Sequence, residues 1–397
     1  MIRKSFWLIK VFIDVRIIET TKDLKDFCKQ DFGDFITIDT EFLRDKTYYP
    51  LLCLVQIGSP KVEPVAVDPL AKDIDLKPLV KLLADETILK VMHAGKQDME
   101  IFYMLMKGKL PAPVFDTQIA ASVLGYGEQI AYHALVKRIC NEDIDKSRQF
   151  TDWSHRPISD AQLKYAIGDV TYLIDVYKNL SEKLEQQGRL EWIKEDMQIL
   201  TNPKTYANDP DLAWQRIKMR SHKKQDYVVL QALAAWREKE AQRVNIPKQR
   251  IMKDDVLTQI ALTKPKDESG FKRIRGMADA FKTGDKAKNL LKIIAKAQKD
   301  IESSTIEIPS NKKKKQADVS HIVDMLKLLL KLNANEHGIA GRMIANVQEL
   351  EDFALEETRD IPMLQGWRYK VFGKEAEALV KGKLTLGLEK GRIKKSG

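Results

Sequence analysis

The sequence predicts a mixed α/β domain followed by two domains built only of helices. Short apolar runs rich in β-branched residues follow one another directly near the N-terminus and then alternate with helical patterns, as in a mixed sheet flanked by helices. From Asn202 onward the spacing of apolar residues favours helices alone, and the pairs Asn202-Pro203 and Asp209-Pro210 mark the change. A chain of 397 residues is also too long for one ordinary domain.

Each element of the α/β domain, predicted over residues 17–200, follows from its local pattern. Strands are predicted at residues 16–18, 35–42, 51–57, 65–68, 88–92 and 114–117. Helices are predicted within residues 20–31 and at residues 76–83, 96–106, 117–124, 134–140 and 160–187. The second, third and fourth strands follow one another without an intervening helix, so we expect them to form an antiparallel meander.

The helical half is divided by a polar linker. The first helical domain is predicted over residues 212–302 and the second over residues 319–392, with a short basic tail after it. Residues 303–318 contain four consecutive lysines and show no periodicity, which is typical of a solvated linker, although these lysines are also suited to phosphate.

Charge is distributed unevenly between the two halves. Residues 1–200 carry 27 Lys and Arg against 31 Asp and Glu, whereas residues 201–397 carry 40 against 26. An acidic first half suits carboxylates that bind metal, and a basic second half suits phosphate. The alternative is that lysine-rich helices serve solubility alone.

Cysteine usage and hydropathy exclude several classes of protein. Cys28, Cys53 and Cys140 form no Cys-x-x-Cys pair, which argues against structural zinc and a disulfide framework and favours a reducing compartment, so we expect a cytoplasmic protein. Residues 1–16 turn from basic to apolar, but Lys10 and Asp14 interrupt the run. We therefore expect no signal peptide and no membrane span there, but an added strand or an extension from an upstream start codon.

Two carboxylates share one face of the second predicted strand. Residues two apart in a strand point to the same side, so Asp39 and Glu41 project together, roughly 7 Å apart along the backbone. A divalent cation between them would remove both their repulsion and their solvation cost. A bare Asp-x-Glu is nevertheless more often only the polar end of a strand.

Three further side chains complete a possible site. Asp98 falls in the first turn of a predicted helix, and Tyr165 and Asp169 share one face of a later helix, because they are four residues apart. Each is weak evidence alone, since Asp98 resembles an ordinary helix cap. Together, four carboxylates suit two divalent cations roughly 4 Å apart, the arrangement that clamps the attacking and leaving oxygens in phosphoryl displacement. Tyr165 is placed to orient the attacking water, because a phenol is a donor at neutral pH.

These segments resemble the three exonuclease motifs of the DEDD superfamily, in the branch with a tyrosine in the third motif, and more narrowly the ribonuclease D family. The motifs that carry the resemblance are Asp39-Thr40-Glu41-Phe42, Leu54-Val55-Gln56-Ile57-Gly58, the stretch from His93 to Asp98, Phe115-Asp116-Thr117, the stretch from Asp152 to Pro157, and the stretch from Gln162 to Val170. The likeness covers residues 17–300. It implies a ribonuclease H-like exonuclease domain.

The resemblance also implies the cofactors and the site. Two Mg²⁺ or Mn²⁺ ions would be held by Asp39, Glu41, Asp98 and Asp169. Tyr165 would orient the attacking water. The family often has an acidic residue where Gly168 stands, and the metal site should not depend on it. We expect His93 to be structural and Asp116 to be a local cap.

The first helical domain resembles the HRDC domain shared by RecQ-type helicases and ribonuclease D. Trp236-Arg237-Glu238, Asn245-Ile246-Pro247, Ile274-Arg275-Gly276-Met277 and the helix 286–299 carry the likeness. The resemblance implies a small helical bundle that helps to bind nucleic acid. The alternative is a bundle with a structural role only, which supports the catalytic domain. The family usually has a second, divergent copy, which we assign to residues 319–392.

The sequence thus predicts a monomeric 3′–5′ exoribonuclease that trims structured RNA, above all transfer RNA precursors, and has no membrane partner. Trp153, Arg156 and Tyr126 are candidates to hold the 3′-terminal nucleotides, with core packing as the alternative for each. Rival functions are a DNA-directed 3′–5′ exonuclease and a catalytically silent RNA-binding protein. The chain has no Gly-x-x-x-x-Gly-Lys-Ser/Thr loop, which disfavours an exonuclease domain that belongs to a helicase. A protein that only binds RNA would not need the five side chains Asp39, Glu41, Asp98, Tyr165 and Asp169 together, which disfavours the catalytically silent alternative.

Overall fold

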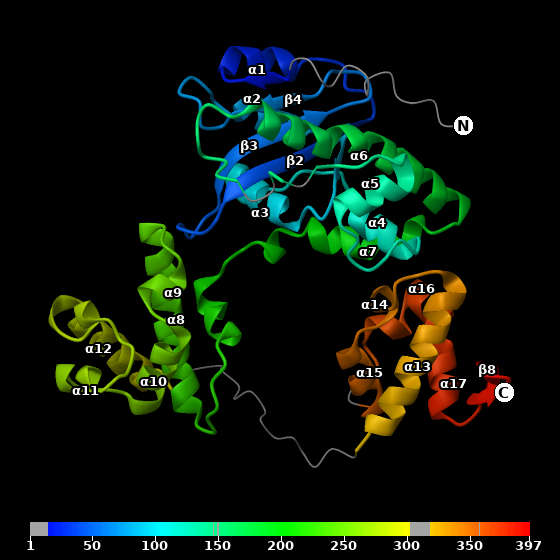
Figure 1. The fold of residues 1–397 in the computed structure, drawn as a ribbon. Coiled ribbons are helices and arrows are strands. Elements are labelled where there is room, and N and C mark those ends of the chain that lie inside the picture. The colour runs from blue at the N-terminus through cyan, green and yellow to red at the C-terminus, as the bar shows by residue number, and fades with distance from the viewer. Residues whose placement is uncertain (1–14, 146, 149–150, 302–317, 357) are drawn as a thin grey trace. The chain divides into compact units, whose positions relative to one another are not determined.

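The structure, a computed structural model, describes residues 15–397 except 146, 149–150, 302–317 and 357 (Figure 1). The described residues form two compact units. The first lies within Met1–Glu41, Leu52–Tyr206 and Gln316–Gly397, and the second within Phe42–Leu51 and Ala207–Lys315. Residues 1–14 and all of the predicted linker except Asp318 fall outside the described residues.

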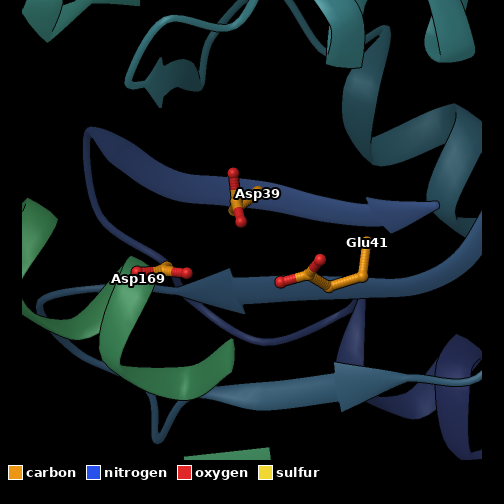
Figure 2. A group of neighbouring side chains, drawn as sticks. All are labelled: Asp39, Glu41 and Asp169. Carbon is orange, nitrogen blue, oxygen red and sulfur yellow. The ribbon is translucent and has the colours of Figure 1, made fainter. Parts of the chain in front are cut away.

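A six-stranded mixed sheet forms the centre of the first unit, with the strand order β1-β4-β3-β2-β5-β6. The strands are β1 (Arg16–Ile18), β2 (Phe35–Leu43), β3 (Leu51–Gly58), β4 (Val65–Val67), β5 (Leu89–Met92) and β6 (Val114–Asp116). β3 and β4 are antiparallel, while β1 with β4, β2 with β5 and β5 with β6 are parallel. Consecutive strands β2, β3 and β4 are neighbours, as the meander prediction requires, and Figure 2 shows their arrows alternating in direction.

Within the described residues, seven helices lie between or after these strands, up to residue 200. They are α1 (Thr21–Phe27), α2 (Lys77–Leu83), α3 (Lys96–Leu105), α4 (Thr117–Val123), α5 (Tyr132–Cys140), α6 (Asp160–Gln186) and α7 (Leu190–Leu200). The first six were predicted, with ends that differ by a few residues, and α7 was not. The α6 helix begins at a capping box, in which Ser159 and Gln162 satisfy each other's backbone N–H groups.

Helix α6 approaches the sheet closely where β2 and β3 meet it. The hydroxyl of Thr37 on β2 donates to the carbonyl of Val170 on α6 at 2.7 Å. A Cβ at Gly58 on β3 would lie 2.5 Å from that hydroxyl and 3.1 Å from the same carbonyl. The absence of a side chain at Gly58 therefore lets α6 lie against the sheet, and this close approach sets the distance between α6 and the carboxylates of β2.

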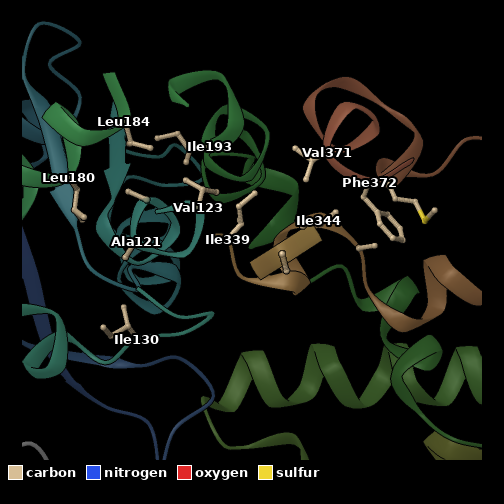
Figure 3. Close-up of a cluster of buried hydrophobic side chains, with 14 of the residues drawn as sticks. Ala121, Val123, Ile130, Leu180, Leu184, Ile193, Ile339, Ile344, Val371 and Phe372 are labelled. Atoms are coloured by element: carbon tan, nitrogen blue, oxygen red, sulfur yellow. The ribbon is translucent and has the colours of Figure 1, made fainter. Parts of the chain in front are cut away.

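The C-terminal segment packs into the same core as the sheet domain. Its helices are α13 (Ser320–His337), α14 (Gly341–Ile344), α15 (Val347–Ala354), α16 (Gly366–Arg368) and α17 (Lys374–Val380), with a π-helical turn at Tyr369–Gly373. One continuous cluster of buried apolar side chains joins Val123 and Ile193 to Ile344 and Phe372 (Figure 3). The described part of the C-terminal segment is thus a structural part of the first unit.

The prediction that no strands follow residue 202 is wrong. Strands β7 (Thr385–Glu389) and β8 (Arg392–Ser396) form an antiparallel hairpin, so the expected helical domain does not continue to residue 392. The turn residues Lys390 and Gly391 have φ values of 49° and 77°, as a two-residue hairpin turn demands. The alternation Thr-Leu-Gly-Leu-Glu before this Lys-Gly pair is the signal that sequence reasoning missed.

The second unit has its own helical core. Its helices are α8 (Lys224–Val244), α9 (Lys248–Ile251), α10 (Asp254–Thr263), α11 (Glu268–Lys272) and α12 (Gly284–Lys299), preceded by a 3-10 segment at Pro210–Arg216. Leu230, Leu257, Phe271 and Leu290 are fully buried in it. Helix α8 ends at Asn245, which has φ 50°, as the predicted break at Asn245-Ile246-Pro247 requires.

Among the helices of the described residues, none has the length and hydropathy needed to cross a membrane.

Candidate active site

Two strand carboxylates and one helix carboxylate meet at the face of the sheet under α6. Asp39 and Glu41 lie on the same face of β2, and Asp169 reaches the same place from α6 (Figure 2). One oxygen from each can be chosen so that all three lie within 4.8 Å of one another. The three side chains are half-buried. Segments about 130 residues apart in the chain therefore place their carboxylates around one point.

Asp98 lies beside this group. It is in the first turn of α3, is buried, and accepts a hydrogen bond of 2.5 Å from the hydroxyl of Thr40, the residue between Asp39 and Glu41. Asp98 is not one of the three residues whose oxygens come within 4.8 Å of one another. Its charge nevertheless acts on both strand carboxylates, because it contributes to raising the pKa of Asp39 and that of Glu41.

The turn that presents Asp98 is organised by Asp116. The carboxylate of Asp116 caps α4 by accepting from the backbone N–H of Gln118 at 2.7 Å. It also accepts from the backbone N–H groups of Ala94 and Gly95, at 3.2 and 2.8 Å, immediately before α3. The predicted capping role of Asp116 is confirmed, and the same side chain holds the start of α3, a role that sequence reasoning missed.

His93 has a structural role, as predicted. Its two ring nitrogens lie 2.9 Å from the hydroxyl of Thr117 and 3.0 Å from the carbonyl oxygen of Ile130. Both nitrogens are therefore occupied in joining β5 to neighbouring segments.

The four carboxyl groups hold protons more tightly than ordinary ones. Burial is the main cause, and it raises the pKa of Glu41 to about 9, of Asp169 to about 7 and of Asp98 to about 6. The pKa of Asp39 is raised well above its usual range by burial and by the charges of the other three. Carboxylate oxygens are the ligands that hard divalent cations prefer, and a bound cation would relieve this repulsion. The donor set therefore fits a divalent metal site.

Tyr165 lies one helical turn before Asp169, near enough that the two groups influence each other's pKa. Burial and the neighbouring carboxylates raise the pKa of the phenol, so the hydroxyl stays protonated at neutral pH. A protonated phenol is a hydrogen-bond donor, and the role of Tyr165 in orienting the attacking water stays a prediction.

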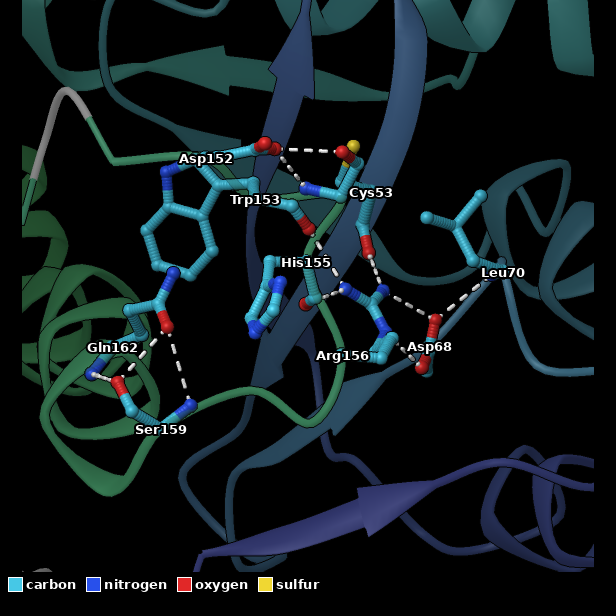
Figure 4. Close-up of polar contacts among 10 residues, drawn as sticks. Cys53, Asp68, Leu70, Asp152, Trp153, His155, Arg156, Ser159 and Gln162 are labelled. Carbon is cyan, nitrogen blue, oxygen red and sulfur yellow. Dashed lines mark hydrogen bonds and ion pairs between the residues drawn. The ribbon is translucent and has the colours of Figure 1, made fainter.

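Trp153 and Arg156 are not free for nucleotides, and that candidate role is corrected. Trp153 is only 2% exposed, and its ring packs on Tyr165 with centroids 6.1 Å apart. The guanidinium of Arg156 pairs with Asp68 and donates to the carbonyl oxygens of Cys53, Trp153 and His155 (Figure 4). These bonds pin the segment before α6 to β3 and β4. Sequence alone did not reveal this role, because the partner carboxylate lies 88 residues away.

Tyr126, the third candidate for nucleotide binding, is half-buried. Its hydroxyl lies 2.5 Å from Nζ of Lys183, and the same ammonium lies 5.1 Å from the centre of its ring. The ring therefore already has a cation near it, and a role in RNA binding stays a prediction.

Comparison with known proteins assigns both parts of the chain. The sequence model of the 3′–5′ exonuclease family matches residues 15–185, and that of the HRDC domain matches residues 226–294. The HRDC match covers one of the two predicted helical domains, so the assignment of residues 319–392 to a second copy stays a prediction.

Individual relatives cover nearly the whole chain. Ribonuclease D of Nitrobacter hamburgensis is 43% identical over 379 residues, which cover 95% of this chain and 98% of that protein. Ribonuclease D of Gluconacetobacter diazotrophicus is 44% identical over 387 residues, 97% of each chain. The crystal structure of Escherichia coli RNase D, an exoribonuclease involved in structured RNA processing, is similar with a TM-score of 0.79 at 25% identity, covering 93% of this chain and 99% of that one. The chain therefore belongs to the ribonuclease D family and is a 3′–5′ exoribonuclease that carries an HRDC domain.

Proposed function

We propose that the protein trims the 3′ ends of structured RNAs with short 3′ tails, transfer RNA precursors above all, by two-metal hydrolysis. The observation that carries the proposal is the convergence of carboxylate oxygens from Asp39, Glu41 and Asp169 within 4.8 Å, with Asp98 beside them. The involvement of the related Escherichia coli enzyme in structured RNA processing supports the choice of substrate.

The proposed metal ligands are Asp39, Glu41, Asp98 and Asp169, holding two Mg²⁺ or Mn²⁺ ions. When bound, such ions lower the pKa of a water and stabilise negative charge on the leaving oxygen. The carboxylates must release their protons for this, which their raised pKa values make costly without the cations.

The chain's own groups position the reaction. The protonated hydroxyl of Tyr165 is proposed to donate a hydrogen bond to the attacking water and so orient it next to Asp169. The water oxygen forms a bond to the terminal phosphorus as the bond from phosphorus to the 3′ oxygen breaks. The shortened RNA keeps a 3′ hydroxyl, and a nucleoside 5′-monophosphate leaves.

The HRDC domain is proposed to supply phosphate contacts. Helix α12 carries five exposed lysines, namely Lys286, Lys288, Lys292, Lys296 and Lys299. Lysines on a solvent-exposed helix face attract the RNA backbone without reading its sequence. We also propose that the protein acts as a monomer of 45.5 kDa, which light scattering would test.

The decisive experiment digests a 3′-tailed transfer RNA precursor in the presence of Mg²⁺ or Mn²⁺ and sequences the products. The wild-type protein is expected to shorten the tail from the 3′ end and release 5′-monophosphates. Asp39→Asn and Asp169→Asn are expected to abolish trimming while RNA binding persists. Glu63→Gln, which removes an exposed carboxylate, is the matched control.

The rival DNA-directed activity is tested in the same assay. A single-stranded DNA of the same sequence as the tail is added as a competing substrate. Preferential digestion of the DNA would overturn the proposed substrate, and trimming by Asp39→Asn at the wild-type rate would overturn the metal site.

A further inference from the structure

Gln56 is a buried polar side chain in the otherwise apolar strand β3. It lies within residues 54–58, a motif that carries the family resemblance but has no task in the proposed reaction, and its exposed fraction is 0%. Nε2 and Oε1 of its carboxamide are both shielded from solvent, and neither has a hydrogen-bond partner within the described residues. A buried amide without a partner is costly, because it has given up its bonds to water. Such a group marks a place where a neighbouring charge or a bound group completes the bonding.

The close approach at Gly58 fixes the register between β2 and β3. A Cβ at Gly58 would lie 2.5 Å from the hydroxyl oxygen of Thr37, so these two residues lie directly opposite each other. The strands are neighbours joined only by residues 44–50, a link short enough to require an antiparallel pair. Two residues back along β3 therefore correspond to two residues forward along β2, which places Gln56 opposite Asp39. The same register pairs the last residue of β2 with the second residue of β3, in agreement with the observed strand ends.

Gln56 and Asp39 also point to the same side of the sheet. A Cβ at Gly58 would lie 3.1 Å from the carbonyl oxygen of Val170, so this side of β3 faces α6. Side chains two residues apart share a face, and so do side chains directly opposite each other on neighbouring strands. The Cβ atoms of such an opposite pair are about 5 Å apart. The side chain of Gln56 is long enough to cross that gap, so its carboxamide can reach the carboxylate of Asp39 directly or through one water.

We propose that Gln56 is a positioning residue of the metal site, which hydrogen-bonds the ionised carboxylate of Asp39 and fixes the orientation in which that carboxylate binds a cation. This inference rests on the proposed role of Asp39 as a metal ligand. Carboxylates that bind metal are themselves held by hydrogen bonds from neighbouring groups, and these bonds strengthen metal binding. An amide suits this role, because it offers a donor without a positive charge that would repel the cation.

A structural role for Gln56 alone would have a different consequence. If the amide stabilised the metal-free fold, its removal would lower the Tm in the presence of a chelator. Because neither amide atom has a partner within the described residues, an apolar side chain of similar length should instead be tolerated there. The positioning role therefore predicts a loss that is confined to metal binding.

The test uses the full-length protein and compares Mn²⁺ binding, measured by calorimetry without RNA, with thermal unfolding in a chelator. Gln56→Met keeps the length of the side chain and removes both amide groups. It is expected to weaken Mn²⁺ binding by about tenfold. Its Tm in the chelator is expected to equal or exceed that of the wild type. If Gln56→Met does not fold, Gln56→Leu makes the same test with the same expected losses.

Leu54→Met is the matched control. Leu54 is fully buried and lies two residues from Gln56 on the same face of β3, but its replacement removes no polar group. It is expected to bind Mn²⁺ with the wild-type affinity. A second measurement is the rate of RNA trimming at rising Mn²⁺ concentration. Excess Mn²⁺ should restore trimming by Gln56→Met, because the ligands themselves remain, whereas Asp39→Asn should stay inactive.

The outcomes separate this inference from the proposed function. Wild-type Mn²⁺ affinity in a folded Gln56→Met or Gln56→Leu variant, with Asp39→Asn deficient, would overturn the positioning role and leave the metal site standing. A lower Tm in the chelator with unchanged Mn²⁺ affinity would overturn it in favour of a structural role. Failure of the wild-type protein to bind Mn²⁺, or undiminished binding by Asp39→Asn, would instead overturn the proposed metal site and the inference together.

Discussion

Trp192 and Trp367 stack face to face, with ring centroids 4.5 Å apart and planes 5° from parallel. The pair joins α7 to α16, which are separated by more than 160 residues. The Arg189 guanidinium lies 4.7 Å from the centre of the Trp192 ring and donates to the carbonyl oxygens of Val123 and His337, at 2.6 and 2.7 Å. The C-terminal segment is held to the catalytic domain by aromatic stacking as well as by shared apolar core.

The first prediction follows from that stack. Trp367→Ala should lower the free energy of unfolding by about 2–4 kcal/mol, somewhat less than the loss of a fully buried Trp, because the ring is only half-buried. Denaturant unfolding followed by circular dichroism measures it. Leu388→Ala in the same segment removes a side chain that is 81% exposed and should change stability by less than about 0.5 kcal/mol. Equal changes in the free energy of unfolding for the two variants would show that the stacked pair does not stabilise the protein.

The second prediction concerns Arg156. Arg156→Ala should destabilise the protein by about 3–5 kcal/mol, because it leaves the buried carboxylate of Asp68 without its partner. RNA affinity, measured by filter binding below the unfolding temperature, should stay at the wild-type level. Arg156→Ala combined with Asp68→Asn should recover part of the stability. A loss of RNA affinity in a fully folded variant would restore the RNA-binding role that we have corrected.

The third prediction isolates the phenol of Tyr165. Tyr165→Phe should reduce kcat roughly 10²-fold with little change in KM, because only the orientation of the water is lost. Mn²⁺ affinity should be unchanged. Tyr172→Phe, which removes a hydroxyl further along the same helix, serves as the control. Equal kcat values for the two variants would contradict the assigned role.

The fourth prediction concerns pH and the metal-free protein. Folding raises the carboxyl pKa values to about 7 for Asp169 and about 9 for Glu41, so the folded state binds more protons than the unfolded state. The associated stability is complete below about pH 4, where unfolded carboxyl groups titrate, and is lost as pH rises through these values. The Tm should therefore fall between about pH 4 and pH 9 in a chelator.

Divalent metal should reverse that trend. Because a cation binds the deprotonated carboxylates, saturating Mg²⁺ should raise the Tm most at the alkaline end of the range. Asp169→Asn should flatten the fall in Tm without metal, since one of the titrating groups is gone. A Tm in the chelator that rises toward alkaline pH would contradict the predicted linkage.

Local patterns were sufficient for much of the fold. Apolar β-branched runs predicted all six strands of the sheet, and helical spacing placed Tyr165 and Asp169 on one face of α6. Period-two alternation put Asp39 and Glu41 on one face of β2. These properties depend on residues within one or two turns or pleats, so a sequence window contains all the information they need.

The partners of Arg156 and Trp153 were not predictable in the same way. Arg, Trp and Asp occur both at RNA-binding surfaces and in buried networks, and only the fold brings Asp68 to Arg156 across 88 residues. The hairpin β7–β8 was missed for a different reason. It is short and exposed, and its apolar alternation amounts to two leucines before a Lys-Gly turn.

The sequence by itself determined the sheet, the long helix α6 and the identities of the carboxylates, because each follows from short-range periodicity and motif spacing. Only the tertiary structure decided which distant groups meet. It brought Asp169 to Asp39 and Glu41, placed the C-terminal segment in the core of the sheet domain, and grouped Phe42–Leu51 with the helical unit. Such meetings depend on how whole elements pack, and packing is settled by summed apolar burial and by a few buried polar bonds rather than by any local pattern.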